Sequence, residues 1–174
     1  MQSSSTPQTG GPSAHPITIR RMKLADIDEV KQIDDLSFTL SWPRKAFMYE
    51  LEKNPTSRFY VAEVPEHDGA ERVVGMLGLW LIIDEIHIST LAVHPDYRRQ
   101  GAAYALIARA LLEGLAKGAT SASLEVRESN LAAQELYKKF GFKITGRRPR
   151  YYKDNNEDAV LMTILNLDTI RKVI

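Results

Sequence analysis

Apolar and polar residues recur along the chain with two periods, and each period predicts one kind of element. Where they alternate every second residue, or form a short apolar run, the pattern predicts a strand. Where apolar residues recur at every third and fourth position, it predicts a helix. The predicted strands cover 17–21, 58–63, 72–83, 85–93, 121–126, 142–146 and 159–165, and the predicted helices cover 26–36, 43–53, 101–117 and 130–140. Together these elements indicate an α/β fold.

Two connections between the predicted strands differ in character. A polar loop over 65–71 has Asp68 and Gly69 as its turn, so the strands on either side of it should form a hairpin. The last two strands are joined by a stretch over 147–158 that carries arginines, tyrosines and acidic residues. We interpret this stretch as a loop.

The predicted strand over 85–93 has a break in its alternation. Ile86 and Ile88 share one face, whereas Leu91 and Val93 fall on the other under strict alternation. An extra residue near 89–90 would restore the phase, so we expect a β-bulge there, which would leave a backbone N–H outside the ladder. The alternative is a strand buried on both faces, which needs no bulge.

The stretch over 91–103 carries the most chemical information, because a strand there passes through a turn into a helix that begins with small residues. If the helix begins at Gly101, the free N–H groups of about residues 100–103 point outward together, and the helix dipole adds partial positive charge. Small side chains at Ala102 and Ala103 leave this backbone accessible, and Arg98 and Arg99 are cationic neighbours. The stretch therefore predicts a pyrophosphate-binding site, and the alternative is an ordinary strand-to-helix turn.

Two sequence blocks resemble a known enzyme family. Residues 98–103, Arg-Arg-Gln-Gly-Ala-Ala, fit the Arg/Gln-x-x-Gly-x-Gly/Ala pattern of the GCN5-related N-acetyltransferases. Residues 124–142, which read LEVRESNLAAQELYKKFGF, resemble the corresponding stretch of the bacterial ribosomal-protein alanine N-acetyltransferases. The resemblance implies a mixed, mostly antiparallel sheet of six to seven strands flanked by about four helices. It also implies acetyl-CoA as co-substrate.

The resemblance further implies roles for individual residues. In this family, a free amide at the end of the strand over 85–93 polarises the thioester carbonyl, and a helix-capping asparagine lies close to the cofactor. The implied acetyl-CoA-binding residues are Leu91, Ala92, Val93, Arg98, Arg99, Gln100, Gly101, Ala102, Ala103 and Asn130. The implied contacts to the acceptor are Trp42, Tyr151 and Tyr152.

The composition argues against several other kinds of chemistry. Without cysteine the chain has neither a disulfide framework nor a thiolate nucleophile, which suits a reducing cytoplasm. The four histidines include no pair at metal-ligand spacing, so we expect no metal. A net charge of +1 provides no broad field for nucleic acid or an anionic membrane, and the basic residues over 147–153 are nearly balanced by the acids that follow.

The first residues differ from the rest of the chain. Residues 1–16 are rich in Ser, Gly and Pro and lack an apolar run, so they predict a flexible tail that is neither a signal peptide nor a membrane anchor. Residues 17–174 are enough for a single domain, which we expect to be a monomeric cytoplasmic protein without nucleic-acid or membrane partners.

An acetyl transfer to an amine needs a base for the amine proton, stabilisation of the carbonyl oxygen and a proton for the departing thiolate. Glu125, alone or through water, is the candidate base, and Tyr137 is the candidate acid, which the resemblance supports at the matching position. We expect Tyr137 to be half buried. The alternatives are a solvated strand glutamate and a core tyrosine.

The acceptor follows from acid–base chemistry and from the resemblance. An α-amine is about 2.5 pKa units easier to deprotonate than a lysine, which favours α-amines for a carboxylate base. The resemblance implies an N-terminal alanine of a small-subunit ribosomal protein. A lysine or small-amine acetyltransferase of the same fold and a non-catalytic CoA-binding module remain open as alternatives.

Overall fold

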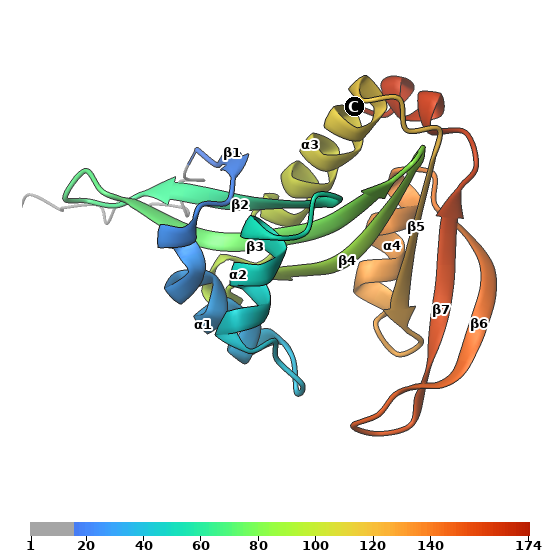
Figure 1. Cartoon of the computed structure of the whole chain (residues 1–174), viewed down its shortest axis with the longest axis horizontal. Coiled ribbons are helices and arrows are strands. Elements are labelled where there is room, and N and C mark those ends of the chain that lie inside the picture. The colour runs from blue at the N-terminus through green and yellow to red at the C-terminus, as the bar shows by residue number, and fades with distance from the viewer. Residues whose placement is uncertain (1–15) are drawn as a thin grey trace, which may run out of the picture.

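A computed structural model describes residues 16–174, which form a seven-stranded sheet with helices on both faces (Figure 1). The strands are β1 (Thr18–Arg21), β2 (Ser57–Pro65), β3 (Glu71–Ile82), β4 (Glu85–Val93), β5 (Ser121–Arg127), β6 (Lys143–Tyr152) and β7 (Glu157–Ile164). Their order across the sheet is β1-β2-β3-β4-β5-β7-β6. Only β4 and β5 pair in parallel among these described strands, so the predicted mixed, mostly antiparallel α/β fold is confirmed.

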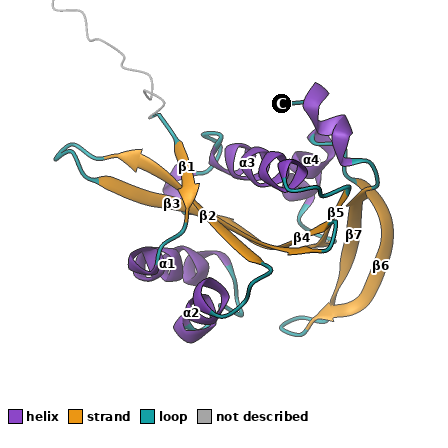
Figure 2. Ribbon diagram, turned by 45° about the horizontal axis from the view of Figure 1, so that its top comes forward, coloured by secondary structure: helices purple, strands orange, loops and turns teal. Residues whose placement is uncertain are grey.

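Four α-helices cover the two faces of the sheet (Figure 2). They are α1 (Ile27–Ser37), α2 (Arg44–Glu52), α3 (Ala102–Ala116) and α4 (Leu131–Lys139), and short 3-10 helices cover Leu24–Asp26, Pro95–Tyr97 and Leu167–Lys172. One buried cluster joins α1 and α2 to the sheet, and a larger cluster on the opposite face joins α3 and α4 to it. No helix within residues 16–174 is both long and apolar enough to cross a membrane.

The centre of the sheet opens because β4 and β5 pair along only part of their length. Their pairing runs from Glu85 with Ser121 to Ile88 with Leu124, and beyond it the two strands diverge (Figure 1). On its other side, β4 has an irregular register with β3, in which Gly78 pairs with Thr90 but Leu79 pairs with Ile88. Ser89 is thus the extra residue. The predicted bulge is confirmed, and it lies where the strands separate.

The structure differs from the sequence-based predictions at two places and leaves the tail and the domain assignment untested. The stretch over 147–158 is not a loop: β6 continues to Tyr152, and β7 begins at Glu157, so the connection is a tight turn. Tyr137 is only 6% exposed rather than half buried, because it lies at the centre of the α4 face that packs on the sheet. The predicted tail over 1–16 lies outside the described residues except for its last position, and the assignment of 17–174 to one domain stays a prediction.

Candidate active site

A cavity of about 340 Å³ lies on the α1–α2 face of the sheet, where β4 and β5 diverge. Five parts of the chain line it: the α1–α2 connection, the bulged part of β4, the end of β5, α4 with its cap Asn130, and the turn after β6. Its lining includes Phe38, Leu40, Trp42, Ser89, Leu91, Glu125, Asn130, Tyr137, Tyr152 and Asp154. The walls therefore combine aromatic and apolar side chains with polar ones, among them the carboxylates of Glu125 and Asp154.

Glu125 is held by two basic side chains. Its own side chain is only 9% exposed. Arg148 on β6 donates from Nε to Glu125 Oε1 at 2.9 Å, and His87 on β4 places Nε2 3.2 Å from Glu125 Oε2. Both carboxylate oxygens are therefore engaged, one by a half-exposed guanidinium and the other by a ring on the adjacent strand.

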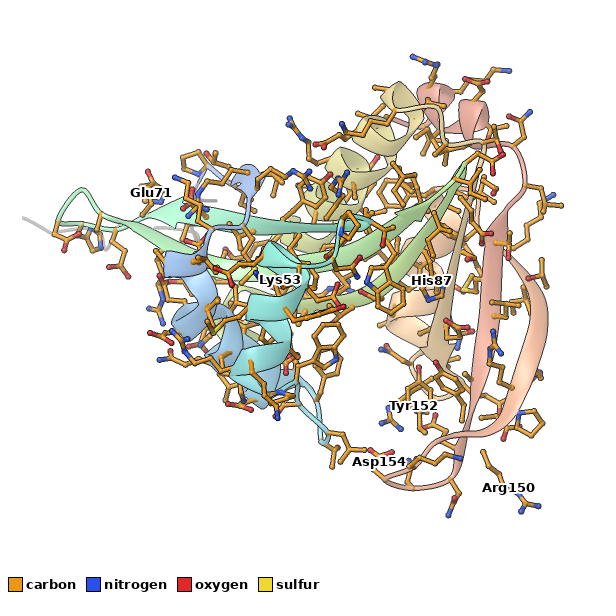
Figure 3. The ribbon with its side chains drawn as sticks, in the orientation of Figure 1. Lys53, Glu71, His87, Arg150, Tyr152 and Asp154 are labelled. Carbon is orange, nitrogen blue, oxygen red and sulfur yellow. The ribbon has the colours of Figure 1, made fainter. Side chains whose placement is uncertain are left out.

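The ring of His87 is held by partners on both of its nitrogens. The Ser123 hydroxyl donates to Glu85 Oε1 at 2.6 Å, so Ser123 Oγ accepts from His87 Nδ1 at 3.2 Å. The second ring nitrogen, Nε2, lies 3.2 Å from Glu125 Oε2. The ring of His87 therefore bridges Ser123 and Glu125. In Figure 3 the labelled His87 lies beside β5, and the labelled Tyr152 lies below it, next to the β6–β7 hairpin.

Tyr137 reaches the cavity from α4. Burial raises the pKa of the Tyr137 hydroxyl above its ordinary value, and nearby Tyr152 adds to the rise, so this phenol keeps its proton at neutral pH. Burial also raises the pKa of Tyr152 to about 12. Both tyrosines therefore face the cavity as neutral hydrogen-bond donors.

The start of α3 has the features of an anion site. Gly101 has φ of +95°, a backbone conformation that favours glycine, and a side chain there would meet no atom within 4 Å. The first described intrahelical bond is donated by Ala105 N to Gly101 O, and no acceptor within residues 16–174 takes the N–H groups of residues 101–104. These four amides are thus available to a ligand.

The other predicted acetyl-CoA contacts lie in different surroundings. Leu91 and Asn130 line the cavity, and Asn130 also caps α4 by accepting from Ala133 N at 3.2 Å. Arg98 and Gln100 instead stabilise the turn, because Arg98 Nε donates to Val93 O and Gln100 Nε2 donates to Asp96 O. Arg99, with φ of +64°, is exposed, whereas Ala92 and Ala102 are buried and can offer only backbone groups. Val93 and Ala103 are partly buried.

The predicted acceptor contacts are only partly brought together. Trp42 and Tyr152 line the cavity, and Trp42 packs on Phe47 at a ring distance of 5.5 Å. Tyr151 is 44% exposed and touches the edge of Tyr152, but it does not line the cavity. Phe38, Leu40, His87 and Arg148 were not predicted. The alternation along β4 could have indicated His87, because in a regular strand its side chain lies on the face opposite to buried Ile86 and Ile88.

Comparison with known proteins gives one family. Residues 27–142 match the acetyltransferase (GNAT) family. A Bacillus subtilis protein described as a candidate ribosomal protein bS18-alanine N-acetyltransferase is 40% identical over 146 residues, which cover 84% of this chain and 93% of that protein. An N-alpha-acetyltransferase from Sulfurisphaera tokodaii is 35% identical over 83% of this chain and 90% of its own length.

A solved structure agrees with these relatives. The crystal structure of the ribosomal-protein-S18-alanine N-acetyltransferase from Escherichia coli superposes with a TM-score of 0.75 at 27% identity, covering 86% of this chain and 93% of that one. The resemblance seen in residues 98–103 and 124–142 therefore extends over most of the chain. The protein belongs to the GNAT family of acetyltransferases and is an N-acetyltransferase.

Proposed function

We propose that this enzyme transfers the acetyl group of acetyl-CoA to the α-amine of a protein N-terminus, with the N-terminal alanine of ribosomal protein bS18 as its acceptor. The observation that carries the proposal is the position of Glu125, a nearly buried carboxylate inside an aromatic cavity where β4 leaves β5. The bacterial relatives named above support the acceptor, and the archaeal relative supports an α-amine.

In the proposed reaction the amine attacks the thioester carbon directly. Glu125, directly or through one water, accepts the proton that the amine loses, and the new C–N bond forms as the C–S bond breaks. Arg148, which is half exposed, is the partner of Glu125 that the amine displaces. His87 stays on the other oxygen and keeps the carboxylate oriented.

Three further features complete the chemistry. Tyr137, whose raised pKa keeps its hydroxyl protonated, donates a proton to the departing CoA thiolate. The free amides at the start of α3 bind the pyrophosphate of CoA. The bulge at Ser89 frees backbone groups of β4 beside the cavity, where they can polarise the thioester carbonyl.

A peptide assay tests this function. Purified protein is mixed with acetyl-CoA and a peptide that begins with the bS18 N-terminal sequence, and release of the CoA thiol is followed. We expect release with the free N-terminus and none with the same peptide blocked at its N-terminus but carrying a free lysine. Glu125→Gln should lower kcat by about 10²-fold or more, the usual contribution of a general base.

The matched control is Glu128→Gln, because Glu128 pairs with Arg147 and does not line the cavity. Acetylation of the lysine peptide instead would make the enzyme a lysine acetyltransferase. Release with neither peptide nor any other amine, despite CoA binding, would overturn the proposal in favour of a non-catalytic CoA-binding module.

A further inference from the structure

Trp80 packs flat against His87. The two residues are direct partners in the register of β3 with β4, and their rings stack with centroids 5.6 Å apart and planes 13° apart. Ser123 is in turn the direct partner of His87 in the register of β4 with β5. A row of side chains therefore crosses three strands and ends two residues before Glu125 on the same face of β5.

Trp80 is itself fixed by α2. Its indole Nε1 donates to Glu50 Oε2 at 2.9 Å, and Asn54 Nδ2 donates to the same oxygen at 2.9 Å. Asn54 Oδ1 accepts from both the backbone and the hydroxyl of Thr56. The plane of the indole is thereby tied to the end of the helix that follows Trp42, which lines the acceptor cavity.

The imidazole of His87 has to satisfy two partners at once. Nδ1 lies 3.2 Å from Ser123 Oγ and Nε2 lies 3.2 Å from Glu125 Oε2, so a small rotation of the ring breaks one or both contacts. These two contacts hold the ring nitrogens, and a parallel aromatic surface in addition resists tilting of the ring out of its plane. Trp80 provides this surface.

We propose that Trp80, held by Glu50, is a positioning residue that keeps His87 aimed at Glu125 and so keeps the Glu125 carboxylate directed at the acceptor amine. The inference rests on the function proposed above, since it assigns Glu125 as the base. It adds a mechanical link from α2, through two stacked rings, to that base.

A double-mutant cycle tests the inference in the full chain. Trp80→Leu removes the stack, Trp80→Phe keeps an aromatic face without the N–H, and His87→Ala removes the ring that Trp80 supports. We expect Trp80→Leu to lower kcat about tenfold and Trp80→Phe to stay within about threefold, since small misplacements of reacting groups are costly. The KM for acetyl-CoA should change less than twofold in both variants.

Glu50→Ala should lower kcat as Trp80→Leu does, and Glu50→Gln, which keeps an acceptor oxygen, should restore most of it.

The decisive measurement is Trp80→Leu in the His87→Ala background. If Trp80 acts through His87, this second change should alter kcat less than twofold, because the two effects are not additive. A full tenfold loss in that background, or a wild-type kcat for Trp80→Leu alone, would overturn the inference. Thermal unfolding and CoA binding are measured on each variant to identify a general loss of folding. If Trp80→Leu or Glu50→Ala does not fold, the kcat values of Trp80→Phe and Glu50→Gln test the inference instead. Failure of the proposed function can be told apart from failure of this inference, because in the first case the unmodified enzyme would release no CoA thiol.

Discussion

At the scale of single residues, the buried hydroxyl of Tyr137 has the protonation state that an acid requires. Burial raises the pKa of Tyr137, so it can give a proton to a thiolate but carries no charge beforehand. We expect Tyr137→Phe to lower kcat about 10²-fold, since it deletes only the proton donor. The ring keeps its edge contact with Phe142, at 5.7 Å, and so preserves the fold.

Steady-state kinetics with varied acetyl-CoA and peptide check this expectation. Tyr104→Phe is the matched control, because its hydroxyl donates to Val173 O and lies outside the cavity. An unchanged kcat in Tyr137→Phe would assign thiolate protonation to another group, and Tyr152, the second protonated phenol of the cavity, would be the first to test.

The partners of Glu125 mark the limit of what the sequence could predict at this scale. Alternation along β5 was enough to place Glu125 on the less apolar face, and its match to the family block indicated a catalytic role. His87 lies 38 positions before Glu125 and Arg148 lies 23 positions after it, on different strands. Neither contact leaves a local pattern, since each depends on which strands become neighbours and in which register.

At the scale of elements, a variant at the start of α3 tests the anion site, and a variant at the end of the same helix serves as its control. Gly101 and Gly118 flank this helix, both have φ above +90°, and a side chain at either would meet no atom within 4 Å. A valine at either position therefore introduces similar backbone strain, about 1 kcal/mol or more. Only at Gly101 would the new side chain also shield the free amides that we propose to bind the pyrophosphate of CoA.

We expect Gly101→Val to raise the KM for acetyl-CoA about tenfold or more, because it covers the anion site, and Gly118→Val to leave it within twofold. Both variants should lose similar amounts of thermal stability. Titration calorimetry with CoA, beside thermal unfolding, separates the two effects. Equal affinities for CoA in the two variants would show that these amides do not bind the cofactor.

The elements themselves were largely predictable, and the exceptions have physical causes. Periodicity located the seven strands and four α-helices of residues 16–174, and a phase break was enough to predict the bulge near residues 89–90. The stretch over 147–158 was misread as a loop because its charged residues and Pro149 do not alternate with apolar ones. It forms a strand since β6 is a largely exposed edge, where pairing with β7 needs no buried face.

At the scale of the whole molecule, the wall of the candidate active site depends on how the β6–β7 hairpin is fixed beside the cavity. Arg127, at the end of β5, pairs with Asp154 at 2.7 Å and with Glu157 at 3.2 Å, and its guanidinium lies 4.0 Å from the centre of the Tyr152 ring. One side chain therefore joins β5 to both ends of the turn that carries Tyr152. The hairpin and the cavity wall are stabilised together.

This arrangement predicts an acid-dependent stability. Hydrogen bonds from Ser129, Asn155 and Arg127 lower the pKa of Glu157 from 4.5 to about 2, and a hydrogen bond from Arg127 lowers the pKa of Asp154. A carboxyl group with a lowered pKa in the folded state stabilises that state above its ordinary pKa, and the stabilisation is lost as the pH falls towards the folded value. For Glu157 the window is pH 4.5 down to about 2.

We therefore expect Arg127→Met to be less stable than the unmodified protein at pH 7, and the difference to narrow as the pH falls through this window. In both proteins the ionised carboxylates of Asp154 and Glu157 stop stabilising the folded state at low pH. This stabilisation is smaller in the variant from the start, so the variant loses less stability than the unmodified protein. Urea unfolding at pH 7, 5 and 3 measures the difference. Arg44→Met is the control, because the pair of Arg44 with Asp28 is largely exposed and should contribute little at any of these pH values. A stability difference that stays constant from pH 7 to 3 would mean that Arg127 holds the hairpin by its packing on Tyr152 rather than by its charge.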